Sequence, residues 1–178
     1  MASRIALLRG INVGGNRKLP MADLRALAAE IGLGNPRTYV ASGNLVFESD
    51  EAPARLENQL EEAIGKRFGF PVDVVVRTGD EWAAAADGNP FPEESRAAPN
   101  LVMIVLGKQL PDEAAIEALR QRAGPNEKVE RVGAAIWIWF GDGAGRSRLG
   151  TAPRTGVWTS RNWRTVQALR DMVEARCR

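Results

Sequence analysis

The sequence predicts an α+β protein built from two tandem ferredoxin-like (alpha-beta plait) domains with antiparallel sheets. Three observations carry this prediction. Apolar runs and helical periodicity alternate over residues 1–78 in the order strand, helix, strand, strand, helix, strand. A turn-rich stretch follows, and residues 100–178 then start the same order again.

Six elements are expected in the N-terminal domain, residues 1–78. Short apolar runs predict its strands, and apolar residues spaced three or four apart predict its helices. Turn residues inside the third segment divide it into a hairpin. In order, the elements are a strand at 5–11, a helix at 20–31, a hairpin at 37–48 that turns at Ser42-Gly43-Asn44, a helix at 54–68 and a strand at 72–77.

Residues 79–99 are expected to form a linker that contains a short helix. The C-terminal domain, residues 100–178, is then predicted as strand, helix, strand, strand, helix. Because this order ends without a last strand, we expect the second plait to be incomplete, or to share or borrow an element. Its elements are a strand at 101–106, a helix at 111–122, a hairpin at 128–140 turning near Gly133, and a helix from about Arg161 to the C-terminus.

Composition excludes several classes of function. The chain of 178 residues contains no histidine, which removes histidine-based nucleophile systems, histidine zinc sites and the usual proton shuttle near neutral pH. The single cysteine, Cys177, can form no internal disulfide. No signal or membrane segment is evident, so we expect a cytoplasmic protein with no membrane partner. No metal-ligand cluster, cofactor motif or catalytic constellation is recognisable, and no catalytic residue can be named.

Positive charge is concentrated in two segments, although the net charge is only +2. Residues 1–18 hold four basic residues and no acid, and residues 141–164 hold five arginines and one acid, Asp142. Two such segments favour anionic partners.

The first basic segment contains a loop, Arg9 to Pro20, between a strand and a helix. A loop of this kind can bind an anion through backbone N–H groups. The P-loop pattern fails, because Asn16-Arg17 stands where Lys-Ser/Thr is needed. Plait topology places this loop and the 42–44 turn on one edge of the sheet, although the glycines also fit a purely structural turn. The candidate ligand-binding residues of this edge are Arg9, Asn12, Gly14, Gly15, Lys18, Ser42, Gly43 and Asn44.

A second candidate site precedes the last predicted helix. Thr159 or Ser160 can cap that helix, which would put Arg161 in its first turn. A cation is unfavourable there, so it is either exposed to solvent or offset by an anion. In the second case, Arg161 and Asn162 would form a second wall for a ligand.

Two tryptophans, Trp137 and Trp139, lie on the same face of one predicted strand, opposite aliphatic residues. An open face would make them a stacking surface or an interface, whereas a covered face would bury them. Burial is favoured, because large exposed aromatic patches are uncommon.

Four motifs carry a resemblance to a known family. They are Leu-Leu-Arg-Gly-Ile-Asn-Val-Gly-Gly (7–15), Thr-Tyr-Val-Ala-Ser-Gly-Asn (38–44), Asn-Pro-Phe-Pro (89–92) and Thr-Ser-Arg-Asn-Trp (159–163). Together they resemble the bacterial family designated domain of unknown function 1697. The resemblance implies tandem plaits and no assigned activity.

The leading hypothesis is a protein that binds a phosphate-bearing ligand, either a nucleotide or a single-stranded nucleic acid, at the Gly/Asn-rich edge of the N-terminal domain. One alternative is a histidine-free phosphoryl- or nucleotidyl-transfer enzyme with bound Mg²⁺. The other is an interaction or dimerisation module that uses the tryptophan-bearing strand. The sequence leaves the oligomeric state open.

Overall fold

The chain is a mixed α+β protein with two four-stranded antiparallel sheets, seen in a computed structural model that describes residues 1–150 and 152–176. Cys177 lies outside the described residues. The chain forms two compact units. Unit 1 comprises residues 1–82 and the chain from residue 168 onward, and unit 2 comprises residues 83–167.

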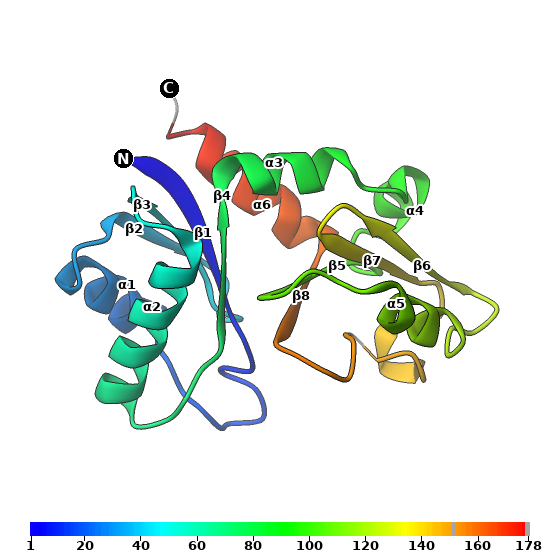
Figure 1. The fold of residues 1–178 in the computed structure, drawn as a ribbon, viewed down its shortest axis with the longest axis horizontal. Helices are drawn as coiled ribbons and strands as arrows, with labels where there is room; N and C mark the ends of the chain where they lie inside the picture. The colour runs from blue at the N-terminus through cyan, green and yellow to red at the C-terminus, as the bar shows by residue number, and fades with distance from the viewer. Residues whose placement is uncertain (151, 177–178) are drawn as a thin grey trace. The chain divides into compact units, whose positions relative to one another are not determined.

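Unit 1 has the element order predicted for the first half of the chain (Figure 1). Its strands lie in the order β2-β3-β1-β4, and every neighbouring pair is antiparallel. The elements are β1 (Ala2–Leu8), α1 (Met21–Glu30), β2 (Gly34–Tyr39), β3 (Asn44–Ser49), α2 (Pro53–Phe68) and β4 (Val74–Thr78).

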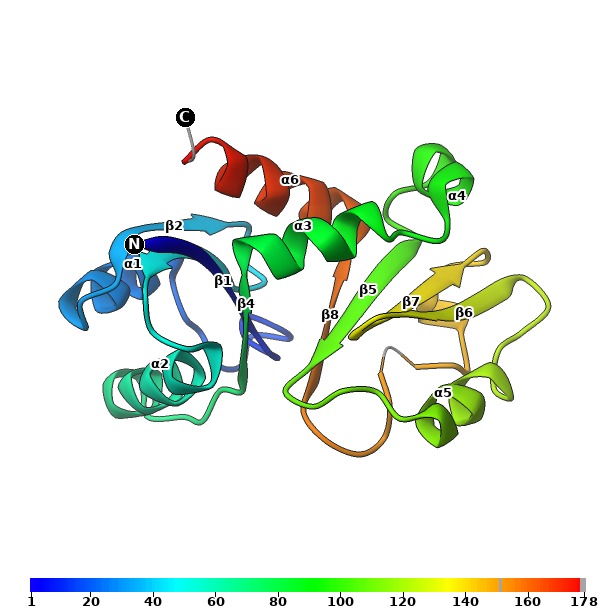
Figure 2. The same ribbon diagram turned by 45° about the horizontal axis from the view of Figure 1, so that its top comes forward.

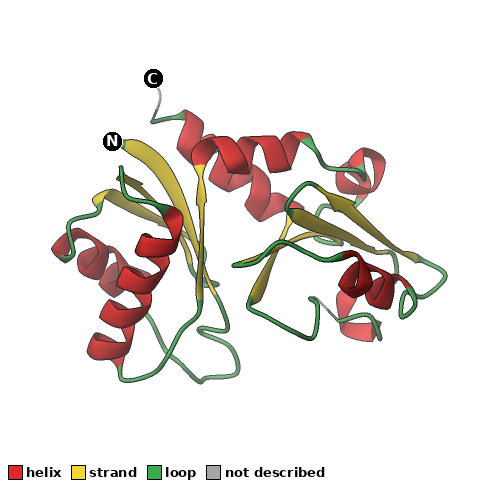
Figure 3. Ribbon diagram, viewed as in Figure 1, coloured by secondary structure: helices red, strands yellow, loops and turns green. Residues whose placement is uncertain are grey.

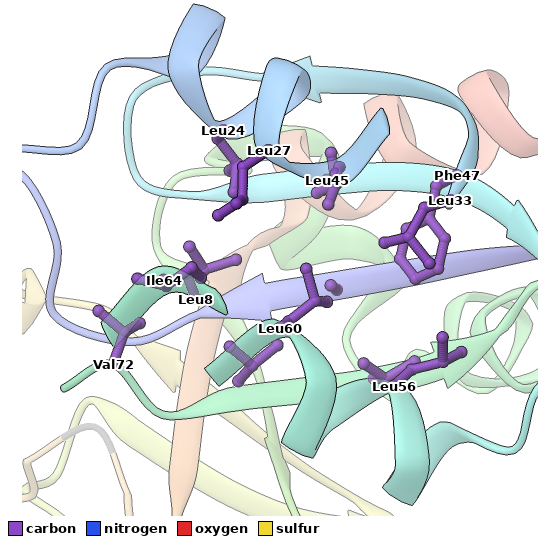
Figure 4. Close-up of a cluster of buried hydrophobic side chains, with 14 of the residues drawn as sticks. Leu8, Leu24, Leu27, Leu33, Leu45, Phe47, Leu56, Leu60, Ile64 and Val72 are labelled. Carbon is purple, nitrogen blue, oxygen red and sulfur yellow. The ribbon is translucent and has the colours of Figure 1, made fainter. Parts of the chain in front are cut away.

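The core of unit 1 lies between its sheet and helices α1 and α2 (Figure 4). The period of two in a strand puts Ala6 and Leu8 of β1 on the same face. The helical period places Leu56, Leu60 and Ile64 of α2 against that face, and all three are fully buried. Helix α2 ends at a glycine in the left-handed conformation.

Two glutamates of α2 bond to strand β4, which is an edge of the sheet. Glu57 Oε1 accepts a hydrogen bond of 2.9 Å from the backbone N–H of Val76, and Glu61 Oε1 accepts one of 2.8 Å from Val74. An edge strand presents backbone groups that need partners. These carboxylates therefore complete the sheet edge, a role that the sequence did not reveal.

Unit 2 repeats the same strand order, as β6-β7-β5-β8 (Figure 2). Its core joins Ile116 and Leu119 of the amphipathic α5 to Ile136, Ile138 and Phe140 of the sheet. The elements from the unit boundary onward are α3 (Gly79–Asp87), α4 (Pro92–Ala97), β5 (Val102–Gly107), α5 (Glu113–Arg120), β6 (Glu127–Val132), β7 (Ala135–Phe140), the 3₁₀ helix η1 (Ala144–Arg146), β8 (Trp158–Asn162) and α6 (Trp163–Glu174).

The prediction that the second sheet lacks its last strand is wrong. Strand β8 pairs with β5, with Arg161 opposite Ile104, and is the fourth strand. The described residues between β7 and β8 form η1 and loop, so this unit lacks a second crossover helix and not a strand. The sequence of β8 is polar and does not have the pattern of a strand. This segment is a strand because it pairs with β5, which is far away in the sequence.

Arg176, which follows the end of α6, belongs to unit 1 and bonds to β3. Arg176 Nη2 donates a hydrogen bond of 3.0 Å to the carbonyl of Val46, and its Nη1 lies 3.5 Å from Glu48 Oε1. Burial of Arg176 lowers the pKa of its guanidinium, against the opposing effect of Glu48. These bonds join the chain after α6 to the first sheet, within unit 1.

The face of β7 that carries tryptophans is covered within unit 2. Trp137 is fully buried, and its ring lies 5.8 Å from that of Trp163. The Nζ of Lys128 lies 5.1 Å from the centre of the Trp139 ring. The favoured expectation, burial of both indoles, is thus confirmed for Trp137, whereas Trp139 is half-buried.

Candidate functional site

The segment between β1 and α1 contains a small hairpin, which we call the finger (residues 12–17; Figure 3 draws the segment as loop). The N–H of Asn12 donates to the Arg17 carbonyl at 3.1 Å, and the N–H of Asn16 donates to the Val13 carbonyl at 3.2 Å. Gly14 and Gly15 at its tip have φ of 60° and 78°. Positive φ at both central residues is typical of a type I′ turn, so the turn itself requires these glycines.

Asn12 ties the finger to the β2–β3 turn. Its Nδ2 donates to the carbonyls of Leu19 at 2.9 Å and Ala41 at 2.8 Å, and its Oδ1 accepts from the Leu19 N–H at 2.8 Å. The Asn12 amide thus bonds to both predicted loops at once. It positions the edge, because both of its N–H groups already have acceptors in the chain.

The 42–44 turn packs directly on the start of the finger segment. A Cβ at Gly43, where φ is 87°, would lie 2.7 Å from Ile11 Cδ1 and 2.8 Å from Leu8 Cβ. The Leu8 N–H donates to the Gly43 carbonyl at 2.8 Å. Asn44 is fully buried and donates through Nδ2 to the Tyr39 carbonyl and to Ser42 Oγ. The two loops therefore lie together, and their small residues have structural roles.

The basic residues of this edge fall into two groups. Arg9 Nη1 lies 3.3 Å from Asp73 Oδ2, and both side chains are about half exposed. Arg17 and Lys18 are exposed and form no ion pair with any residue that the structure describes. These two adjacent cations are the groups of the edge that remain available to an anion.

Positive φ angles at residues other than glycine occur at three positions of these two loops and, among the described residues, also at Asn35 in β2. Asn12, Arg17 and Val40 have φ of 55°, 49° and 49°, although none is glycine. Positive φ is especially costly for a β-branched residue such as Val40. Val40 is 50% exposed, and Val13 on the finger is 68% exposed. Backbone strain of this kind is common at functional sites, so it supports this edge as the candidate site.

The second predicted wall is not formed as expected. Arg161 lies in β8 and is 8% exposed, and its Nη1 donates to Thr159 Oγ1 at 2.8 Å and to the Ser160 carbonyl at 2.7 Å. Burial lowers the pKa of Arg161 to about 10.

The N-terminal cap of α6 also differs from the prediction. Asn162 Oδ1 accepts a hydrogen bond of 3.0 Å from the Thr165 N–H and caps the helix. Neither Thr159 nor Ser160 does so, because α6 begins at Trp163 and Asn162 is the residue that directly precedes it. Several neighbouring residues can cap a helix, and the pairing of β8 decides which of them does.

The described residues contain no group of three or more His, Cys, Asp or Glu side chains placed to hold a metal ion. Across the same part of the chain, no helix is both long enough and apolar enough to cross a membrane.

Comparison with known proteins shows the family. The sequence profile of a family described as "Protein of unknown function (DUF1697)" matches residues 1–137. The chain belongs to this family. The resemblance seen in the motifs is thereby confirmed, and the matched range contains the finger and the 42–44 turn.

A solved structure shows the fold. The chain is similar to the conserved bacterial protein SP0830 from Streptococcus pneumoniae, with 24% identity and a TM-score of 0.78. The similarity covers 97% of this chain and 98% of that one. The comparison with curated proteins gave no match.

Proposed function

We propose that the finger edge of unit 1 binds a phosphate-bearing ligand, and that this ligand is a single-stranded nucleic acid. The observation that carries the proposal is the pair of exposed cations, Arg17 and Lys18, neither of them in an ion pair with a described residue. Cations on a nucleic-acid-binding surface contact phosphate and release counterions.

The way the finger is held supports this proposal. Asn12 bonds it to the β2–β3 turn, and a two-residue turn closes its tip. A segment whose conformation is already fixed loses less conformational entropy on binding than a mobile loop does. Exposed Val13 and Val40 give apolar contact area in the same two loops.

The fold supports the proposal only by analogy. We propose that both units are ferredoxin-like plaits, since each has its first and third strands in the middle of the sheet. This architecture serves many functions, including RNA binding. A cytoplasmic, bacterial setting belongs to the same proposal and is supported by the single cysteine and the bacterial neighbour.

Fluorescence anisotropy with a labelled single-stranded RNA tests the proposal. The variant Arg17→Gln/Lys18→Gln removes the two cations. The variant Arg55→Gln/Lys66→Gln is the matched control, since it removes the same charge from α2, where both cations are already ion-paired. We expect affinity to fall at least tenfold in the first variant and little in the second.

Salt dependence gives an independent measurement. Affinity should decrease steeply between 50 and 200 mM salt, and the slope should be shallower by about 2 in the finger variant, one for each lost phosphate contact. Equal binding by both variants contradicts the proposal. Binding of a mononucleotide but not of RNA would identify the smaller ligand class instead.

A further inference from the structure

A cavity of about 510 Å³ opens in unit 2, between the turn that follows α5 and the loop that follows β7. We propose that it binds the phosphate group of a small phosphorylated molecule, whose apolar part occupies a neighbouring cavity. This site lies in the other unit from the finger and goes beyond the function proposed above. The charged and amide side chains that line it are Arg122, Asn126, Glu127, Asp142, Arg146 and Arg148.

The three arginines of the cavity keep guanidinium N–H groups for a ligand, although Arg122 Nε already donates a hydrogen bond of 3.2 Å to the Ala118 carbonyl. Arg122 is half-buried, while Arg146 and Arg148 are exposed. Within the ranges that the structure describes, none of them forms an ion pair. Guanidinium groups bind phosphate through paired, charge-assisted hydrogen bonds. Three of them around one cavity can bind a group with several anionic oxygens.

The two acids of the cavity are engaged by neutral donors. Glu127 Oε2 accepts a hydrogen bond of 2.7 Å from the Gly124 N–H. Asp142 accepts through both oxygens from Asn126 Nδ2, at 3.3 and 3.1 Å. These bonds shape the rim of the cavity and occupy the carboxylates, so the guanidinium groups are not neutralised by direct pairing.

The loop that carries two of the arginines is fixed to the core. Leu149 is fully buried in the hydrophobic core of unit 2, and its N–H donates to Ser147 Oγ at 2.9 Å. The N–H of Arg146 donates to the Gly143 carbonyl in the turn of η1. Arg146 and Arg148 therefore start from fixed backbone positions, which reduces the entropic cost of binding.

A second cavity, of about 380 Å³, shares Arg122 with the first. Ala115, Ala118 and Pro153 line it together with the polar residues Gln121, Arg154 and Thr155. A cavity with basic walls next to one lined in part by small apolar residues fits a molecule with a phosphate at one end and a flat or apolar group at the other. The volumes lie in the range of small-molecule sites. Nucleoside monophosphates have this chemistry.

Isothermal titration calorimetry of the full chain with adenosine monophosphate, pyrophosphate and adenosine tests the site. We expect adenosine monophosphate to bind, pyrophosphate to bind more weakly and adenosine not to bind measurably. Arg146→Gln/Arg148→Gln should weaken both phosphate-bearing ligands at least tenfold. Arg96→Gln/Arg131→Gln, which removes the same charge from exposed positions of unit 2, should leave the dissociation constants within about twofold.

Two further variants complete the test. Ala118→Leu narrows the apolar cavity, and should weaken adenosine monophosphate about tenfold while sparing pyrophosphate. In an Arg17→Gln/Lys18→Gln background, Arg146→Gln/Arg148→Gln should still weaken both phosphate-bearing ligands at least tenfold, which separates this site from the finger. No heat with wild type, equal binding by the Arg146/Arg148 variant and its control, or adenosine monophosphate binding unaffected by Ala118→Leu would each overturn the proposal.

Discussion

Glu57 Oε1 accepts a hydrogen bond of 2.9 Å from the backbone N–H of Val76, and the carboxylate is buried beside the edge of the first sheet. Glu61, one helical turn later, accepts the N–H of Val74 in the same way. Helix α2 is thereby bonded to the edge strand as well as packed on the core. The edge is satisfied within the chain, which removes a template for pairing with another strand.

Replacing this acceptor should destabilise the protein. We expect Glu57→Ala to lower the free energy of unfolding by about 1–3 kcal/mol, because the buried Val76 N–H loses its partner. Glu57→Gln keeps an acceptor and should cost less. Urea denaturation measures both, with exposed Glu62→Ala on the same helix as the control. Equal losses for Glu57→Ala and Glu62→Ala would show that the bond contributes nothing.

Removing the Asn12 side chain should loosen the finger. Glycine accepts the positive φ of this position, so Asn12→Gly isolates the loss of the three side-chain hydrogen bonds. We expect a loss of about 1–3 kcal/mol of stability and faster amide exchange at Leu19, whose N–H loses its acceptor. Unchanged exchange at Leu19 would contradict the assigned role.

Two glycine substitutions separate steric overlap from backbone strain. Gly43→Ala adds a Cβ under 3 Å from two core side chains, whereas Gly133→Ala adds one in open space, and both glycines have positive φ. Strain alone costs about 1–2 kcal/mol, and overpacking adds about 1–3 kcal/mol. Thermal melts should therefore rank Gly43→Ala well below Gly133→Ala. Equal melting temperatures would rule out close packing between the two loops.

Relieving the strain at Val40 should stabilise the protein. Val40→Asn places a residue that tolerates positive φ at a half-exposed position, so we expect a gain of about 1 kcal/mol in urea denaturation. Val13→Asn is the control, since Val13 is exposed without positive φ and should gain nothing. A destabilised Val40→Asn would mean that the valine side chain makes contacts worth more than the strain.

The buried guanidinium of Arg161 predicts a pH dependence. Its folded-state pKa, about 10, lies below the ordinary value of an arginine, so the unfolded chain holds this proton more tightly. The loss of stability caused by burying this charge is present in full below pH 10 and decreases as the pH rises above 10. The free energy of unfolding of wild type minus that of Arg161→Met should thus be larger at pH 10.5 than at pH 9. The same difference at both pH values in urea denaturation would contradict this.

The local features of the candidate site could be predicted from the sequence, because local chemistry determines them. Gly14-Gly15 requires a tight turn wherever the segment lies, and Ser42-Gly43-Asn44 divides the 37–48 segment into two strands. The strand and helix order then placed both turns on one edge, as the bond from Asn12 to Ala41 shows. The sequence could not show which of these residues remain available to a ligand. Asn12 is used in a bond to the distant Ala41 carbonyl, and the buried Asn44 is used in bonds within its own turn.

By itself, the sequence determined the alternation of elements and the family, since hydrophobic periodicity and turn residues act over a few neighbouring positions. Only the tertiary structure decided that residues 158–162 form a strand and that Asn162 caps the last helix. It also decided that Glu57 bonds to a sheet edge and that three arginines line one cavity. Each of these depends on contacts between residues far apart in the chain, which no local pattern encodes.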